Sequence, residues 1–293
     1  MPSIGSLLQI ARSGLSTQQL AMEVAAHNIA NAATDGYSRQ RVTFTGNPTV
    51  RTVQGVFGSG VHISTIGHVR DELLDRAFYR GLGTATESEA RASVLGRIEG
   101  LFGEPSETGL GAAMDQFYSG WSSLASNPNS TVSRSALRQQ ATALIEKFHS
   151  LVANIDQVRQ DVETRLTVAV DRVTALSADI ARLNTAIVAA ESDGKTAGDL
   201  RDTRGRALTE LAGLIPIDVI ERANGSVGVN SAGLGIIDGG YSLKLEVKTV
   251  SGTVGITVAG SSSLLPQTGA TIGGLLYCDT ARQGHPISLD DHG

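Results

Sequence analysis

A narrow apolar stripe near the N-terminus is the first pattern in the chain. Between Ile4 and Ile29, apolar residues recur at alternating steps of four and three, which is the spacing of the a and d positions of a heptad repeat. Polar residues flank this stripe, so it occupies one edge of a helix and needs a partner helix. Gly36, which can take a left-handed cap, marks the end of the segment. We predict an assembly seam formed by Ile4, Leu8, Ala11, Leu15, Met22, Ala25 and Ile29.

The same helix also fits a more ordinary interpretation, as the first helix of a globular bundle. Two features favour a seam that awaits a partner. The stripe begins almost at Met1, where chain ends usually fray unless they are docked. It is also a strict a/d stripe, which is narrower than the apolar face of most core-facing helices.

A short β insert is predicted near residues 37–68. From Arg39 to Phe44 the pattern changes to a period of two, and residues 46–48 then supply a Gly-Asn-Pro turn. A second alternating stretch lies at residues 61–66. The sequence therefore predicts two short strands between the first helix and the next one.

Helices are predicted to dominate residues 36–216, which we expect to form an elongated rod domain around that insert. One helix is expected from near Asp71 to Phe102, with interruptions at Gly81 and Gly83. A turn follows, and then a helix that carries Phe117 and Trp121. We expect these two aromatic residues to be core anchors rather than a ligand platform.

The longest periodic segment runs from about residue 133 to residue 190. It contains no Pro or Gly, and its apolar residues recur at threes and fours, which predicts a helix of nearly 60 residues. Two successive steps of four, through Val158, Val162 and Leu166, form a stutter in the heptad. A helix this long is far above the globular average and indicates a rod-like domain.

The chain changes character after a return helix that ends near Leu214. Short apolar runs separated by Asn-Gly, Gly-Gly and Ser-Gly turns predict a β-rich domain over residues 217–276, which we expect to be incomplete. Residues 277–293 show no periodicity and are predicted to form an irregular tail. The fold class is therefore mainly α with a β-rich second part, beginning with a coiled-coil helix at residues 1–35.

Composition and charge narrow the possible functions. The chain of 293 residues has a formal net charge of -5, which argues against nucleic acid as a partner. Its one cysteine excludes an intrachain disulfide and a cysteine zinc cluster. We see no stretch of about 18 apolar residues that would predict a membrane span, and no cleavable signal peptide.

Catalytic motifs are not found in the sequence. The six histidines are scattered, and the GxSxG, HExxH and P-loop patterns are missing. Cys278, His285 and His292 could be imagined as a metal site, but their spacing is unusual for zinc. Asn28 and Asn31, near the end of the first helix, are interpreted as cap and turn donors. We therefore expect a protein that is not an enzyme, with no cofactor and no metal.

Several motifs resemble the bacterial flagellar axial proteins, which are the rod, hook and hook-associated components. The segment NIANAATDGYSRQ at residues 28–40 is similar to their common signature. Later blocks resemble, within that group, the family of flagellar hook-associated protein 1, the hook–filament junction proteins. These blocks are GSGV at residues 58–61, RDELL at 70–74, LFGEP at 101–105, Phe117 with Trp121, Asn127-Pro128 with Arg134, and the return segment at 199–214.

This resemblance implies a structural role in flagellum assembly and filament attachment. It implies export through the flagellar type III apparatus, an extracellular location at the hook–filament junction, and self-association in a ring. The hook protein, the next hook-associated junction protein and the export apparatus would be the partners. The seam would belong to an inner tube, and a hinge would lead to the outer domain. The motif residues assigned to this hinge are Asn28, Asn31, Thr34, Gly36, Tyr37 and Arg39.

The chain departs from this family after about Leu276. Family members carry a C-terminal heptad helix that pairs with the N-terminal one, and we expect this chain to be a truncation, a frameshift product or a fragment. Two alternatives remain open: a hook or distal-rod subunit, and a secreted adhesin or enzyme that uses flagellar export.

Overall fold

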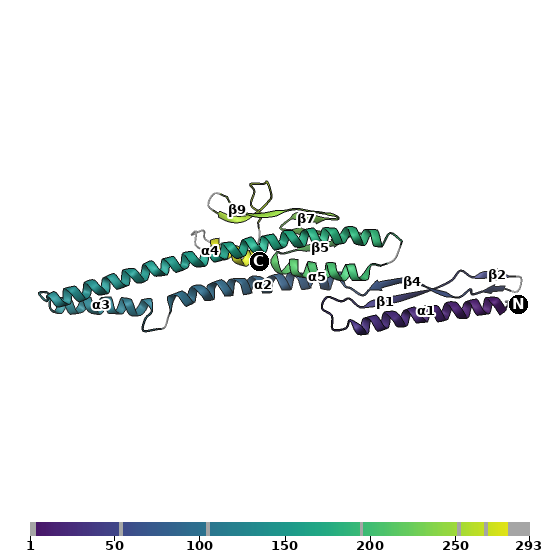
Figure 1. Cartoon of the computed structure of the whole chain (residues 1–293), viewed down its shortest axis with the longest axis horizontal. Helices are drawn as coiled ribbons and strands as arrows, with labels where there is room; N and C mark the ends of the chain where they lie inside the picture. The colour runs from purple at the N-terminus through teal and green to yellow at the C-terminus, as the bar shows by residue number, and fades with distance from the viewer. Residues whose placement is uncertain are drawn as a thin grey trace. The chain divides into compact units, whose positions relative to one another are not determined.

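The computed structural model describes residues 4–52, 55–103, 106–193, 196–250, 253–266 and 269–280. The described chain begins with one helix and a β insert, continues through four helices, and then forms short strands before a last helix (Figure 1). The helices are α1 Ile4–Ala30, α2 Glu72–Phe102, α3 Leu110–Ser126, α4 Thr131–Ala190, α5 Gly198–Leu214 and α6 Ala270–Thr280. The strands are β1 Gln40–Gly46, β2 Val50–Thr52, β3 Gly55–Phe57, β4 Val61–His68, β5 Asp218–Glu221, β6 Val227–Ser231, β7 Leu234–Asp238, β8 Tyr241–Ser242, β9 Leu245–Val250 and β10 Thr253–Val258.

These elements form two compact units, and each unit combines segments that are distant in the sequence. The first unit comprises Met1–Gly81, Thr174–Ala212 and Ile217–Leu243. The second comprises Leu82–Val173, Gly213–Pro216 and Lys244–Gly293. The prediction of a mainly α chain with a β-rich later part is confirmed.

The β insert of the first unit is a long antiparallel hairpin. β1 pairs with β4 from Gln40↔His68 to Gly46↔Val61, and a bulge shifts the register between Thr43 and Phe44. β2 and β3 pair with each other within this connection. The period-two pattern of the sequence therefore identified both long strands, because each hairpin strand alternates its side chains between two faces.

The other part of the first unit packs the C-terminal portion of α4 and α5, up to Ala212, with a four-stranded sheet. The sheet has the order β5-β6-β7-β8, and each neighbouring pair is antiparallel. Apolar side chains from both helices and the sheet are fully buried and form the core. They include Ile180, Ile187, Leu211, Val229, Ile236 and Ile237.

One polar side chain, Asn184 of α4, lies inside this core. Its amide nitrogen donates to the carbonyl oxygens of Val227 and Gly239, at 2.8 Å each. Its amide oxygen accepts hydrogen bonds from the backbone N–H of Val227 and from Nη1 of Arg204, both at 3.0 Å. The side chain is thereby fully satisfied, and it ties α4, α5 and the sheet together at one point.

The second unit is built around the N-terminal part of α4. Val94 of α2 is buried, as are Val158, Val162 and Leu166, which are the three residues of the predicted stutter. Arg97 of α2 forms an ion pair with Asp161 of α4. α4 runs unbroken for 60 residues, so the prediction of one very long helix is confirmed.

Two predictions about regular structure are wrong. α2 is continuous through Gly81 and Gly83, because a glycine inside a helix costs only about 1 kcal/mol relative to alanine. α6, Ala270–Thr280, covers the end of the range predicted to be β-rich, up to residue 276, and the first four residues of the predicted irregular tail; the remaining tail residues, 281–293, lie outside the described part. α6 showed no periodicity because it is apolar on all sides and largely buried.

Close helix packing explains Gly274 of α6. A Cβ on Gly274 would lie 2.7 Å from the backbone oxygen of Glu87 and 3.0 Å from Cβ of Ala90, both in α2. The guanidinium of Arg91 lies 3.9 Å from the ring centre of Tyr277. Glycine therefore lets α6 approach α2 more closely than any other residue would.

The expectation that the sequence contains no stretch apolar enough for a membrane span does not hold for α4. α4 contains an 18-residue window that is long and apolar enough for a membrane span, judged by length and composition alone. This is weak evidence, since the core helix of a soluble protein passes the same test, and 39% of the window is buried.

Replacing Asn184 by leucine, which has nearly the same shape, tests the importance of the buried amide. The variant would remove the side-chain partners of the buried N–H and carbonyl of Val227 and of the part-buried carbonyl of Gly239, and should lower the free energy of unfolding by roughly 3 kcal/mol or more. Urea unfolding followed by circular dichroism measures this change. Asn154→Leu is the matched control, because Asn154 is exposed on the same helix, and equal effects of both changes would contradict this role.

Candidate functional site

The predicted seam lies on the exposed face of α1. Ile4 and Ile29 are 78% and 79% exposed, and Leu8, Leu15 and Met22 are each 65% exposed. Ala11 and Ala25 are exposed as well. No seam residue is therefore covered by the described part of the chain.

α1 instead packs on the β insert through its opposite side. Thr17 and Val24 are its buried residues. The hydroxyl of Thr17 donates to the carbonyl of Val61 at 3.3 Å, and the backbone N–H of Val61 donates to Oγ of Ser13 at the same distance. The first helix is thus attached to the rest of its unit, as the bundle interpretation expects, but the apolar seam has no part in this attachment.

The chain reverses direction between α1 and β1, at residues 31–39, which we call the corner. Asn28, near the end of α1, connects the two ends of this corner by hydrogen bonds. Its amide nitrogen donates to the carbonyl of Gln40 at 2.9 Å, and its amide oxygen accepts from the backbone N–H of Gln40 at 2.8 Å. The same oxygen accepts from the hydroxyl of Tyr37, also at 2.8 Å. Nδ1 of His27 lies 3.0 Å from the same hydroxyl. Because that hydroxyl donates its hydrogen to Asn28, a hydrogen bond with His27 requires the tautomer that carries a proton on Nδ1.

The other motif residues shape the corner locally. The amide nitrogen of Asn31 donates to the carbonyl of His27, and the hydroxyl of Thr34 donates to the side-chain oxygen of Asn31. The carbonyl of Arg39 accepts from the backbone N–H of Val69, next to the end of β4. The sequence-based interpretation of Asn28 and Asn31 as cap and turn residues agrees with these bonds.

α5 holds this corner from outside. The backbone N–H of Ser38 donates to Oδ2 of Asp202 at 3.3 Å, and Nη1 of Arg206 donates to the carbonyl of Asp35 at 3.4 Å. Gly36 has a φ of +73°, and a Cβ there would lie 2.4 Å from Cγ of Arg206. Both the backbone conformation and the close approach of Arg206 therefore require glycine at position 36.

His68, at the end of β4, lies against the same helix. Its Nδ1 is 3.4 Å from Oδ1 of Asp202, and both side chains are nearly buried. Burial lowers the pKa of His68 below its ordinary value, and the carboxylates of Asp202 and Asp199 oppose this only in part. The nearby guanidinium groups of Arg201 and Arg70 lower it further, so the imidazole is held in its neutral form.

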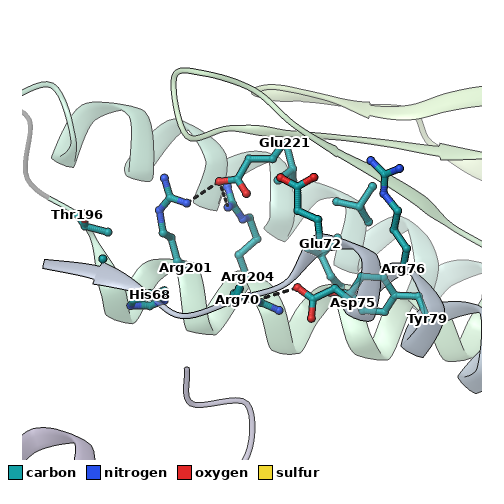
Figure 2. Close-up of a pocket in the computed structure, with 14 residues that line it drawn as sticks. His68, Arg70, Glu72, Asp75, Arg76, Tyr79, Thr196, Arg201, Arg204 and Glu221 are labelled. Carbon is teal, nitrogen blue, oxygen red and sulfur yellow. Dashed lines mark hydrogen bonds and ion pairs between the residues drawn. The ribbon is translucent and has the colours of Figure 1, made fainter. Parts of the chain in front are cut away.

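A cleft of about 340 Å³ opens beside His68 and is lined by charged side chains of α2, α5 and β5 (Figure 2). Arg70 pairs with Asp75, while Arg201 pairs with both Glu191 and Glu221. Burial lowers the pKa of Arg204 to about 10. Its Nη1 donates to Asn184 and to the carbonyl of Gly225. Most of these charged groups are paired with one another. Since Arg201 and Arg204 belong to α5, their bonds help to fix the position of that helix.

Sequence reasoning missed this supporting network. Asp202, Arg204 and Arg206 lie more than 160 residues from the corner, and no spacing rule connects them with it. The sequence predicts residues 199–214 as a return helix and as part of the family resemblance, but not as the support of this corner. The alternation of acidic and basic residues in this segment was the one available signal.

The remaining candidates stay apart from this site. Trp121 is 59% exposed, so the expectation that it anchors the core is wrong; it lies on the solvent face of α3, while the half-buried Phe117 lies beside it. Cys278 is half-buried in α6, and His285 and His292 fall outside the described residues. Within the described ranges, no three His, Cys, Asp or Glu side chains are grouped to hold a metal ion.

Comparisons with known proteins agree with the motifs at the corner. The model of the flagellar hook-associated protein FlgK helical domain matches residues 95–282, and that of the flagella basal body rod protein matches residues 8–37. Flagellar hook-associated protein 1 of Bacillus subtilis is 28% identical over 232 residues, covering 77% of this chain and 46% of the relative. The Escherichia coli protein of the same name is 24% identical over 242 residues, covering 82% and 43%.

A solved structure has the same fold. The flagellar hook junction protein FlgK from Burkholderia pseudomallei superposes with a TM-score of 0.59 and 24% sequence identity, covering 72% of this chain and 39% of that one. The chain thus spans less than half the length of these relatives.

Asn28→Ala should open the corner. The backbone N–H of Gln40 would lose its acceptor, so its hydrogen exchange should accelerate by about tenfold or more, as expected for the loss of roughly 1.4 kcal/mol or more. Exchange measured by mass spectrometry or NMR checks this result. Asn31→Ala is the control, since its side chain bonds only within residues 27–34, and equal acceleration in both variants would argue against a special role of Asn28.

Acid should destabilise the contact between His68 and α5. Because the folded state lowers the pKa of His68, the unfolded chain binds the proton more readily, and stability should fall as the pH drops below about 6.5. We expect the urea midpoint of the wild type to fall more between pH 7 and pH 5.5 than that of His68→Gln. Parallel pH profiles would show that His68 contributes nothing to acid sensitivity.

Proposed function

The chain belongs to the family of the flagellar hook-associated protein FlgK, and we propose that it acts as a structural component of the hook–filament junction. The family is structural and belongs to the bacterial flagellum, an extracellular appendage. Association with other flagellar components follows from this membership. The junction itself, as the place where this chain acts, is our proposal.

The exposed seam of α1 is the observation that carries this proposal. α1 buries Thr17 and Val24 against its own unit and leaves an apolar edge in water, so it gains free energy when another helix covers that edge. Each leucine or isoleucine so covered contributes about 1.5–3 kcal/mol. We propose that this seam packs in the inner tube of the junction, in a ring of copies of this chain.

The corner supports the proposal by giving α1 a defined direction. Asn28, Tyr37 and Gln40 bond to one another, and Asp202 and Arg206 of α5 hold the turn from the other side. A seam can enter a regular assembly only if its helix leaves the outer part at a reproducible angle. The predicted hinge is in this view a stiff joint between inner and outer parts.

The specific partners are inferred from the family. We propose the hook protein on one side, the next hook-associated junction protein on the other, and the flagellar export apparatus during delivery. The seam offers each axial neighbour a helix–helix contact. No nucleic acid, membrane or cofactor is part of this proposal.

A hook or distal-rod subunit is the nearest alternative, because the rod-protein model also matches α1 and the corner. The match of the hook-associated helical domain over residues 95–282 favours the junction. Counting copies per flagellum separates the two, since a junction protein forms a short ring and a hook or rod subunit forms a long stack.

Charged residues in the seam should abolish assembly. Leu8→Asp or Leu15→Asp would place an unpaired charge in a packed interface and should cost roughly 2 kcal/mol or more at each site. The measurement is filament attachment and motility in a bacterium whose own junction gene is replaced by each variant. Arg12→Asp introduces the same residue on the flank of the stripe and should leave assembly nearly intact. Equal losses at seam and flank would contradict the proposal.

A further inference from the structure

Basic and acidic residues are concentrated in different segments of this chain, although its net charge is only -5. Residues 36–70 contain four arginines and no acidic residue, while residues 98–133 contain four acidic residues and no lysine or arginine. The first segment holds the β insert, and the second holds the end of α2 and all of α3.

The arginines of the insert are available for an external partner. Arg39, Arg41 and Arg51 are all exposed, and none forms an ion pair within the described part of the chain. Arg41 lies in β1, and Arg39 comes directly before that strand; because they are two residues apart, extended backbone places them on the same face. Arg70, the fourth, is already paired with Asp75. Exposed apolar side chains lie nearby in the sequence of the insert, namely Phe44, Val50 and Val56.

The acidic segment, residues 98–133, likewise exposes charged side chains, of the opposite sign. Glu99, Glu107 and Asp115 are exposed and form no ion pair with any described residue. Lys147 lies at this surface, where its ammonium group donates to the carbonyl of Thr108 at 2.9 Å, so it offsets one of these charges. Tyr118 and Trp121 of α3 are 62% and 59% exposed. Tyrosine and tryptophan are the residues that most often dominate protein–protein interfaces.

From this complementarity we infer that the basic β insert of one copy docks on the acidic α2–α3 surface of a neighbouring copy. The inference rests on the proposed function, which requires copies of this chain to assemble, and it names the surfaces that meet. The two surfaces differ, so the contact is head-to-tail and each copy can both give and receive it. Repeated around an axis, such a contact forms a ring when the rotation between copies closes a full turn, and an open helix when it does not.

Electrostatics would supply register and aromatic packing would supply much of the affinity. Pairs of opposite charge at an interface rim steer association and suppress wrong alignments. They also make association dependent on salt, because exposed charges are screened beyond about 8 Å at physiological ionic strength. The exposed Tyr118 and Trp121 would be covered by the apolar side chains of the insert.

Charge reversal in two variants tests the inference. Variant A carries R39E, R41E and R51E, and variant B carries E99K, E107K and D115K. Self-association of each full chain is measured by sedimentation velocity at ~50 mM and ~300 mM NaCl, which brackets strong and weak screening. We expect each variant alone to associate at least about tenfold more weakly than the wild type at low salt.

An equimolar mixture of A and B is the decisive measurement. The acidic insert of A can dock on the basic surface of B, and the basic insert of B can dock on the acidic surface of A, so mixing should restore association. A pairing of the two surfaces within one chain cannot be restored in this way. The control reverses three exposed acidic residues elsewhere, in E89K, D171K and D218K, and should associate like the wild type.

Two results would overturn the inference. One is a mixture of A and B that stays as dispersed as each variant alone. The other is a wild type that remains monomeric at low salt and high concentration. Either result leaves the proposed function standing, because that proposal is tested separately by seam variants in whole flagella. If mixing restores association while the seam variants still attach filaments and support motility, the docking surface is supported and the role of the seam is contradicted.

Discussion

The buried amide of Asn184 is the interaction on which the first unit depends. All four of its hydrogen-bonding positions are occupied: two by the backbone of Val227 in β6, one by the carbonyl of Gly239 in the β7–β8 turn, and one by Arg204 of α5. A polar group in such a place is tolerated only when it is completely satisfied, and it then excludes every other arrangement of the groups around it. The position of α5 follows from this restriction.

α5 in turn transmits that position to the N-terminal helix. Asp202 and Arg206 are on this helix, and they hold the backbone of the corner at Ser38 and Asp35. Asn28 then couples the corner to the end of α1. A chain of hydrogen bonds therefore connects the core of the unit with the helix that carries the seam, and each bond involves a group with a fixed direction.

The seam differs from these interactions, because its apolar side chains are not packed against any described part of the chain. α1 contacts its own unit through Ser13, Thr17 and Val24, which are small or medium-sized residues. Its larger apolar residues face outward. A helix arranged in this way buries few residues against its own unit and exposes an apolar face that another helix can cover. This division suits an element that must join an assembly without unfolding the unit behind it.

The sequence by itself determined the elements of this protein, because each depends on a local pattern. The heptad stripe of α1, the alternating strands of the insert and the unbroken period of α4 could all be recognised, since each gives a regular repeat over many residues. The motif at residues 28–40 also indicated the family. Where local pattern was weak, prediction went wrong: α6 is apolar on every side, and α2 passes through two glycines without a break.

Only the tertiary structure decided what surrounds those elements. Trp121 has a helical spacing typical of a core residue, yet it is exposed, because spacing gives the face of a helix but not what covers that face. The contacts of Asp202 and Arg206 with the corner, and of Asn184 with Arg204, join residues through space that no sequence repeat relates. Periodicity is a property of neighbours along the chain, whereas the support of the corner and the exposure of the seam are properties of packing.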